Sequence, residues 1–154
     1  MTKKQKKGFT LIELLVVIAI IGLLATLSVV ALNNARSRAR DSRRVSDIKQ
    51  IQTALELHFN EHDAYPKQTT LGAAHSVLNS SGKDGLHDFI NPIPEAPEPA
   101  DGDCTDDIGN GTNDGNVYGY ISADGSTYSL FYCLGNDTGG IDEGKNEAGP
   151  TTIQ

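Results

Sequence analysis

The sequence predicts an α+β protein in which one long N-terminal helix, serving as membrane anchor and stalk, packs against a small antiparallel β-sheet head. Leu14 to Leu32 form an apolar run of nineteen residues without a charge. A helix rises about 1.5 Å per residue, so such a run nearly spans the roughly 30 Å hydrocarbon core of a membrane. Residues 64–154 are instead rich in turn-forming residues between short apolar runs. One membrane-spanning segment, at about residues 14–32, and one small head are expected.

The helix is expected to continue beyond the apolar run. Apolar residues recur at spacings of three and four, at Val45, Ile48, Ile51, Leu55 and Phe59. This period places them on one helical face, which must pack on the head. No Pro or Gly interrupts residues 23–65, and Pro66 then ends the pattern. We therefore expect a single helix over residues 9–63.

The head, over residues 64–154, is expected to contain a β-hairpin. Two apolar runs, Val117 to Ser122 and Thr127 to Leu134, flank the turn-forming residues 123–126. Four prolines between Pro92 and Pro99 predict a stiff connecting loop. A Gly- and Asp-rich loop is expected at the C-terminal end of the head.

Charge divides the chain and argues against nucleic acid as a partner. Residues 1–50 hold ten Lys/Arg against three Asp/Glu, whereas residues 51–154 hold three against seventeen, a net charge of −14. The basic residues flank the apolar run, and so acidic a head would repel phosphate backbones. No Gly-rich phosphate loop follows a strand, and no Ser or Cys nucleophile has a recognisable base beside it. A non-enzymatic protein is expected.

The residues before the apolar run carry a specific motif. Two lysines precede Gly8, and Gly8 to Glu13 read GFTLIE. This pattern resembles the start of type IV pilins and type II secretion pseudopilins. The resemblance implies a leader over residues 1–8, cut by a prepilin peptidase between Gly8 and Phe9, with methylation of the new amino terminus at Phe9. The alternative is an uncleaved signal anchor.

The resemblance also implies a function. The subunit would be passive and polymerise into a filament, as the major pseudopilin of a type II secretion system does. The alternative is a surface type IV pilin for adhesion, motility or DNA uptake. Implied partners are other copies, minor pilins, the lipid bilayer, the prepilin peptidase and a membrane assembly platform with a cytoplasmic ATPase. The precursor would cross the cytoplasmic (inner) membrane once with its N-terminus inside, and the assembled filament would lie outside. No cofactor is required.

Glu13 would be the fifth residue of the mature chain. The resemblance implies that its carboxylate pairs with the Phe9 α-amino group of its own or an adjacent subunit and sets subunit register. The alternative is that Glu13 rests in the headgroup region at the first turn of the helix, where the helix dipole favours an anion.

A basic stripe follows the apolar run, and it consists of Arg36, Arg40, Arg43 and Arg44. Arg43 can reach Asp47 at i+4. The stripe is either a solvated helix face or a surface that meets acidic groups of neighbouring subunits.

The head contains the chain's two cysteines, Cys104 and Cys133. An exported head meets an oxidising environment, so a disulfide between them is expected. The alternative is two reduced thiols, with Cys133 buried in a strand.

The C-terminal loop resembles the calcium-binding end of major pseudopilins. Leu134, Asp137 and Asp142 are the residues carried over, although Asp142 matches only with a gap. Oxygen ligands on a Gly-rich loop suit calcium. The alternative is a solvated acidic loop.

The sequence His58 to His62 reads HFNEH and fits the H-x-x-E-H pattern of zinc peptidases, in which Glu61 would be the base. No downstream glutamate has a helical context that would supply a third ligand. His58 and His62 are expected to be surface residues of the helix's last turns, and a zinc metallopeptidase is only a remote alternative.

Overall fold

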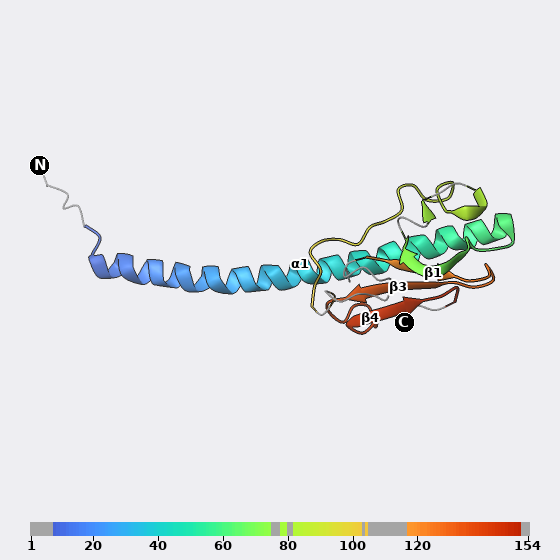
Figure 1. The fold of residues 1–154 in the computed structure, drawn as a ribbon. Coiled ribbons are helices and arrows are strands. Elements are labelled where there is room, and N and C mark those ends of the chain that lie inside the picture. The colour runs from blue at the N-terminus through green and yellow to red at the C-terminus, as the bar shows by residue number, and fades with distance from the viewer. Residues whose placement is uncertain (1–7, 75–77, 80–81, 103, 105–116, 152–154) are drawn as a thin grey trace, which may run out of the picture. The chain divides into compact units, whose positions relative to one another are not determined.

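The computed structural model describes residues 8–74, 78–79, 82–102, 104 and 117–151. The chain divides into two compact units, Met1–Arg36 and Ser37–Gln154. Helix α1, Leu11–His62, has 52 residues and contributes to both units (Figure 1). It contains a stretch whose length and composition suffice to cross a membrane.

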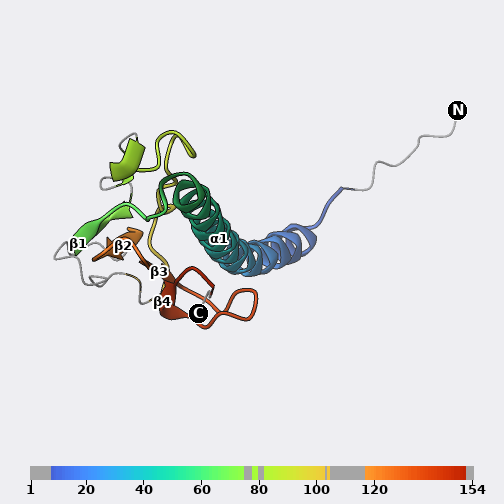
Figure 2. The ribbon, with the colours of Figure 1, turned by 90° about the vertical axis from the view of Figure 1, so that its right-hand side faces the viewer.

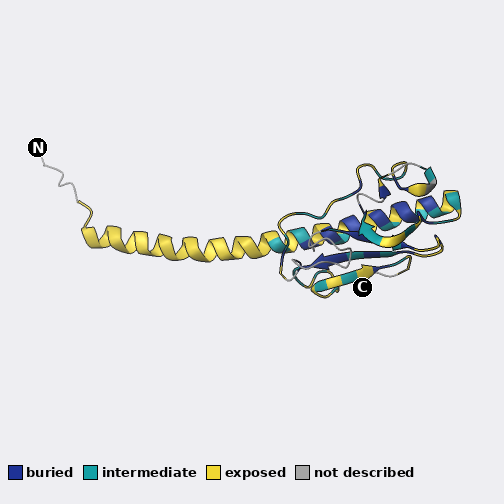
Figure 3. Cartoon of the chain, in the orientation of Figure 1, coloured by how far each residue is buried: buried dark blue, intermediate teal, exposed yellow. Residues whose placement is uncertain are grey.

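Within the first unit, α1 presents its apolar side chains to the surroundings. Every residue from Leu11 to Arg36 is exposed, and this part of the helix is yellow throughout in Figure 3. In the second unit α1 has a buried face, with Ile48, Ile51 and Leu55 completely covered. The same helix therefore changes from an exposed apolar rod to an amphipathic core element.

The C-terminal end of α1 is set by a backbone turn. Asp63 adopts a left-handed conformation with φ of 55°, and its amide donates to the Phe59 carbonyl at 2.8 Å. Asp tolerates this conformation better than most residues do, so it can cap a helix in the position that glycine usually takes. The helix thus ends at His62, four residues before Pro66.

A four-stranded antiparallel sheet forms the other layer of the second unit, in the order β1-β2-β3-β4 (Figure 2). Its strands are β1 Gln68–Ala73, β2 Gly119–Ser122, β3 Ser129–Leu134 and β4 Gly144–Ala148. Tyr120 pairs with Leu130, and Tyr132 pairs with Asn146. A short 3-10 helix, Gly82–Asp84, lies in the connection after β1. Figure 2 shows the sheet along one side of the second half of α1.

The expected hairpin is confirmed as β2 and β3, but β1 and β4 were not expected. β4 has the sequence GKNEA, and it lies where the sequence predicts only a Gly/Asp-rich loop. Its Gly, Lys, Asn, Glu and Ala are all depleted in strands. The strand forms because five consecutive residues of β3 provide a paired edge for it.

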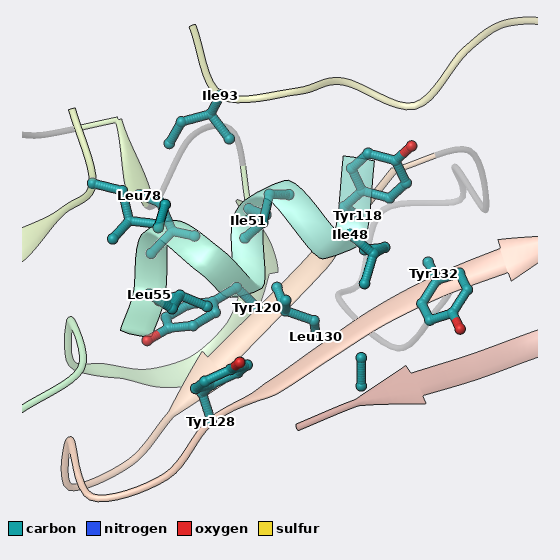
Figure 4. Close-up of a cluster of buried hydrophobic side chains, with 14 of the residues drawn as sticks. Ile48, Ile51, Leu55, Leu78, Ile93, Tyr118, Tyr120, Tyr128, Leu130 and Tyr132 are labelled. Carbon is teal, nitrogen blue, oxygen red and sulfur yellow. The ribbon is translucent and has the colours of Figure 1, made fainter. Parts of the chain in front are cut away.

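The core of the second unit lies between α1 and the sheet (Figure 4). Ile48, Ile51 and Leu55 meet alternate residues of β3, Leu130 and Tyr132, because successive strand residues point to opposite faces. Leu78, Leu86 and Ile93 from the connection after β1 complete this core. The predicted fold class, a long helix with a small antiparallel sheet, is therefore confirmed.

The chain's five tyrosines, Tyr65, Tyr118, Tyr120, Tyr128 and Tyr132, are all buried in this core. The Tyr118 hydroxyl donates to Asp47 at 2.9 Å, and the Tyr120 hydroxyl donates to the Pro66 carbonyl at 2.6 Å. Tyr65 donates to Glu56 at 3.0 Å. Buried tyrosines need such acceptors, so the core is tied together by polar as well as apolar contacts.

Candidate functional site

Gly8, Phe9 and Thr10 immediately precede α1 and are exposed. A side-chain carbon added at Gly8 would meet nothing within 4 Å. The Phe9 side chain is 82% exposed. In the part of the chain that the structure describes, Gly8 and Phe9, between which the motif predicts cleavage, are therefore both exposed.

Glu13 and Thr10 hold the first turn of α1 through reciprocal hydrogen bonds. The Thr10 amide and hydroxyl donate to Glu13 Oε2 at 2.8 and 2.7 Å, and the Glu13 amide donates to the Thr10 hydroxyl at 3.2 Å. This is a capping box, which satisfies backbone donors that a helix start leaves without partners. It holds the Glu13 carboxylate at the helix start, close in sequence to Phe9.

The exposed apolar surface that follows is much larger than a soluble protein tolerates. Leu11, Leu23 and Ile18 are each more than half exposed, as are most large side chains up to Val30. Contiguous apolar surface of this size marks contact with lipid or with other protein. The arrangement can therefore anchor the chain in a bilayer or pack helices together.

The basic stripe is not uniform, and here the sequence expectation needs correction. Arg44 is 1% exposed, so it neither faces solvent nor is free to contact another subunit. Its Nη1 donates to Asp41 at 2.7 Å and to Asp101 at 3.1 Å, and its Nη2 donates to the Pro97 and Pro99 carbonyls at 2.9 and 3.3 Å. Arg40 donates from Nε to Asp101 at 2.7 Å and pairs with it again through Nη2.

These four side chains, Arg40, Asp41, Arg44 and Asp101, are called the ion-pair cluster below. The Arg40 hydrogen bond lowers the pKa of Asp101, and the Asp101 hydrogen bond raises the pKa of Arg40. Both shifts favour the charged forms of Arg40 and Asp101, as expected for a carboxylate that is hydrogen-bonded to a guanidinium. The physical reason for the correction is that buried carboxylates need cationic partners, and Arg40 and Arg44 supply them within the chain.

Arg36 and Arg43 differ from this pair. Arg36 is exposed, and the Arg43 side chain is 69% exposed, with its Nε 3.9 Å from the Asp47 carboxylate. The predicted i+4 contact is therefore present but long. These two arginines of the stripe can still meet another molecule.

Asp41 and Asp101 were not singled out from the sequence. Asp41 accepts from the Gly135 amide at 3.0 Å and from Asn136 Nδ2 at 2.8 Å, besides its bond to Arg44. Its partners lie 94 and 95 residues away along the chain. No local pattern could reveal such a group.

Cys104 and Cys133 form a disulfide in the structure, with their Cα atoms 5.5 Å apart. Both residues are buried. The bond joins the segment after Asp101 to strand β3.

The three residues of the expected calcium site are held as follows. Leu134 ends β3 and pairs with Gly144. Asp137 accepts from the Glu143 amide at 2.9 Å, and the Asp142 carbonyl accepts from Asn146 at 3.0 Å. Within the described ranges, no group of three or more His, Cys, Asp and Glu side chains could hold a metal ion.

The HFNEH segment forms the last turns of α1, and His58 is buried, not exposed as expected. Its Nδ1 lies 2.8 Å from the Ala64 carbonyl, and its Nε2 lies 3.1 Å from the Gly82 carbonyl. Both ring nitrogens are thus engaged by the backbone. His58 anchors the chain after the helix, and this contact argues against the zinc peptidase alternative.

This geometry defines the class of protein architecture to which the chain belongs. A helix with a capped, exposed apolar start, whose second half packs on a small antiparallel sheet, is a pilin-like arrangement. Residues 3–29 match the model of the prokaryotic N-terminal methylation motif.

Curated relatives come from both systems that the motif suggests. Type II secretion system core protein G of Aeromonas hydrophila is 35% identical over 99 residues, which cover 64% of this chain and 59% of that protein. A fimbrial protein of Pseudomonas aeruginosa is 39% identical over 88 residues, which cover 52% of this chain and 57% of that protein. Type IV major fimbrial protein FimA of Dichelobacter nodosus is 37% identical over 92 residues, which cover 55% of this chain and 58% of that protein. No solved structure matches the chain.

The chain thus carries the prepilin-type N-terminal motif, and its relatives are pseudopilins and type IV pilins. It spans less than two thirds of the length of these curated relatives.

Proposed function

We propose that this chain is a structural subunit of a type IV pilus-like filament, most like the major pseudopilin of a type II secretion system. A prepilin peptidase removes residues 1–8 and methylates Phe9. The observation that carries the proposal is the motif GFTLIE at the start of an exposed apolar helix, with Glu13 held there by Thr10. The subunit performs no catalysis.

Before assembly the precursor crosses the cytoplasmic membrane once, with its N-terminus inside and its head outside. The exposed apolar part of α1 supports this anchoring because a helix of its length and composition can span lipid. An assembly platform with a cytoplasmic ATPase then moves the subunit into a growing filament outside the membrane. Minor pilins join the same filament. There the apolar helices pack on one another instead of on lipid.

Glu13 sets the register between subunits in this proposal. Cleavage after Gly8 creates an α-amino group at Phe9, whose reference pKa is about 8, so the group is largely cationic at neutral pH. A cation entering an apolar filament core needs an anion beside it. Glu13, four residues further on, supplies the carboxylate to its own or an adjacent subunit. To do so it must share or leave the Thr10 donors that hold it in the isolated chain.

The test separates processing from assembly. The full chain is produced in cells that contain a prepilin peptidase and an assembly platform, and its mass is measured together with the filament fraction sheared from the cells. Wild type should lose residues 1–8, gain one methyl group and form filaments. Glu13→Ala should be processed but not assemble, whereas Gly8→Val should not be processed. A Glu13→Ala subunit that builds filaments at wild-type yield would refute the pairing role.

A surface pilus is the second candidate because fimbrial proteins are among the relatives. Antibody to the head distinguishes the two. Long labelled fibres on cells at native expression favour a surface pilus. Head antigen confined to the cell envelope, together with loss of protein secretion on deletion, favours a secretion pseudopilus.

A further inference from the structure

The ion-pair cluster and the disulfide hold the same two segments together. The described residues of one segment are Pro97 to Gly102 and Cys104, and the other segment runs from Cys133 to Asn136. Asp101 of the first segment lies three residues before Cys104, and Gly135 of the second lies two residues after Cys133. A contact between Asp101 and Gly135 therefore brings the two cysteines close together.

That contact is direct and leaves no room for side chains. A side-chain carbon added at Gly135 would collide with the side chain and backbone of Asp101, and one added at Gly102 would lie 2.9 Å from the Gly135 carbonyl oxygen. Gly102 also has a φ of 56°, which favours glycine. Two glycines thus allow the two backbones to touch beside the cysteines.

Charged groups of α1 bind both segments through contacts that involve no sulfur atom. Arg40 and Arg44 bind the Asp101 carboxylate, and Arg44 also binds the Pro97 carbonyl. Asp41 binds the Gly135 amide. The Arg44–Asp41 pair then connects the two sets of contacts at 2.7 Å. Finally, the Cys104 amide donates to the Asp101 carbonyl at 3.2 Å, which fixes the turn that leads into the cysteine.

We propose that the ion-pair cluster positions Cys104 against Cys133 before the disulfide forms. Arg40, Asp41, Arg44 and Asp101 are positioning residues in this proposal, which does not depend on the filament function. The cluster raises the effective concentration of one thiol at the other, because it fixes the two segments that carry them. Oxidation then adds a covalent bond to a contact that already exists.

The chemical step is ordinary thiol–disulfide exchange with a disulfide oxidant such as glutathione disulfide. One cysteine thiolate attacks the oxidant and releases one reduced thiol. The second cysteine then attacks the mixed disulfide and releases the other. Two protein thiols become one disulfide, and one oxidant disulfide becomes two thiols, so atoms and electrons balance.

The test measures this equilibrium in the full chain held in detergent micelles. Wild type, Asp101→Asn and Arg44→Met are equilibrated in mixtures of reduced and oxidised glutathione, and free thiols are counted by alkylation. Both variants should lower the effective concentration of one thiol at the other about fivefold or more, since coupling between two sites commonly amounts to a factor of about 5 to 150. Unchanged equilibria in both variants would overturn the proposal.

Tyr118→Phe is the matched control. It removes the Tyr118 hydrogen bond to Asp47, another buried polar contact of α1 in the same unit, and none of the hydrogen bonds named above that hold the segments carrying the cysteines. Its thiol equilibrium should stay close to that of wild type. If it shifts as far as that of Asp101→Asn, general destabilisation explains the effect, and the positioning role is refuted.

A second measurement serves if the charge variants fail to fold. In a Cys104→Ser, Cys133→Ser double variant, the Gly135 amide should still exchange slowly with deuterium, because its acceptor is Asp41 and not a group that the disulfide supplies. Fast exchange of this amide in the otherwise folded variant would mean that the disulfide holds the cluster. The proposal would then be wrong.

Discussion

The Arg44 guanidinium and the Asp41 carboxylate form an ion pair one helical turn apart with a separation of 2.7 Å, and both side chains are almost fully buried. Arg44 is the largest of the fully buried side chains among the described residues. Removing two charges from water is costly, and only good geometry with further hydrogen bonds compensates for it. Here the compensation comes from Asp101, two proline carbonyls, the Gly135 amide and Asn136.

The first prediction concerns charge reversal in this cluster. Arg44→Glu would place three carboxylates together in the interior. Breaking a buried pair typically costs about 3 to 5 kcal/mol, and like charge adds to that cost. The free energy of unfolding, measured by denaturant titration followed by circular dichroism, should fall by at least this amount. The control is Arg38→Glu, which makes the same charge change at an exposed position. Equal stability of the two variants would contradict the structure.

The second prediction concerns filament assembly through the exposed part of the basic stripe. Arg36 and Arg43 lie seven residues apart and so share a helical side, while Arg38 points elsewhere. Reversing both to Glu should leave the head folded, because the Arg43 side chain is mostly exposed and its long 3.9 Å contact with Asp47 is worth at most about 1 kcal/mol. Filament yield in the sheared fraction should fall, since an acidic head needs cations from its neighbours. Arg38→Glu should assemble better than this double variant, and equal yields would refute the role.

The third prediction is that the head loses stability in alkali. Burial raises the pKa of Tyr132 to about 12, and burial with the neighbouring Glu56 raises the pKa of Tyr65 to about 12. Burial likewise raises the pKa of Tyr118, Tyr120 and Tyr128. In the unfolded chain tyrosine ionises near pH 10. Above that pH the unfolded state loses protons that the folded state keeps, so the free energy of unfolding falls as pH rises.

Between pH 10 and the folded-state pKa, each tyrosine should lower the free energy of unfolding by up to about 1.4 kcal/mol per pH unit. Denaturant titrations at pH 8, 10, 11 and 12 would measure it. Tyr132→Phe should make the free energy of unfolding less dependent on pH by the contribution of one tyrosine. A stability that does not change between pH 8 and pH 12 would show that the phenols are accessible.

The fourth prediction concerns calcium at Leu134, Asp137 and Asp142. Calcium bound there should raise the melting temperature of the full chain in detergent as the calcium concentration increases, because a ligand that binds only the folded state stabilises it. Asp137→Asn should abolish the rise, while magnesium should not reproduce it. A melting temperature that calcium leaves unchanged would remove the site, and the hydrogen bond from the Glu143 amide to Asp137 would then be the role of that carboxylate.

The sequence by itself determined the elements that have a local or periodic pattern. The apolar run and the spacing of Ile48, Ile51 and Leu55 predict α1, and the two apolar runs around residues 123–126 predict the β2–β3 hairpin. Residues 3–29 carry the N-terminal methylation motif within one short stretch of the chain. Such features depend on neighbours in sequence, so no knowledge of the tertiary fold is needed to find them.

The tertiary structure alone decided which polar residues became structural. In the sequence, Arg40 and Arg44 look like members of one solvated stripe, and His58 looks like a surface residue. The spacing of residues along a helix does not reveal which of its faces other segments of the chain will cover. Their partners, Asp101 and the Gly82 carbonyl, arrive from segments 61 and 24 residues away. β4 forms for the same reason, since its pairing with β3 outweighs its weak strand propensity. Burial and long-range pairing are properties of the packed chain, and they changed the roles of these residues.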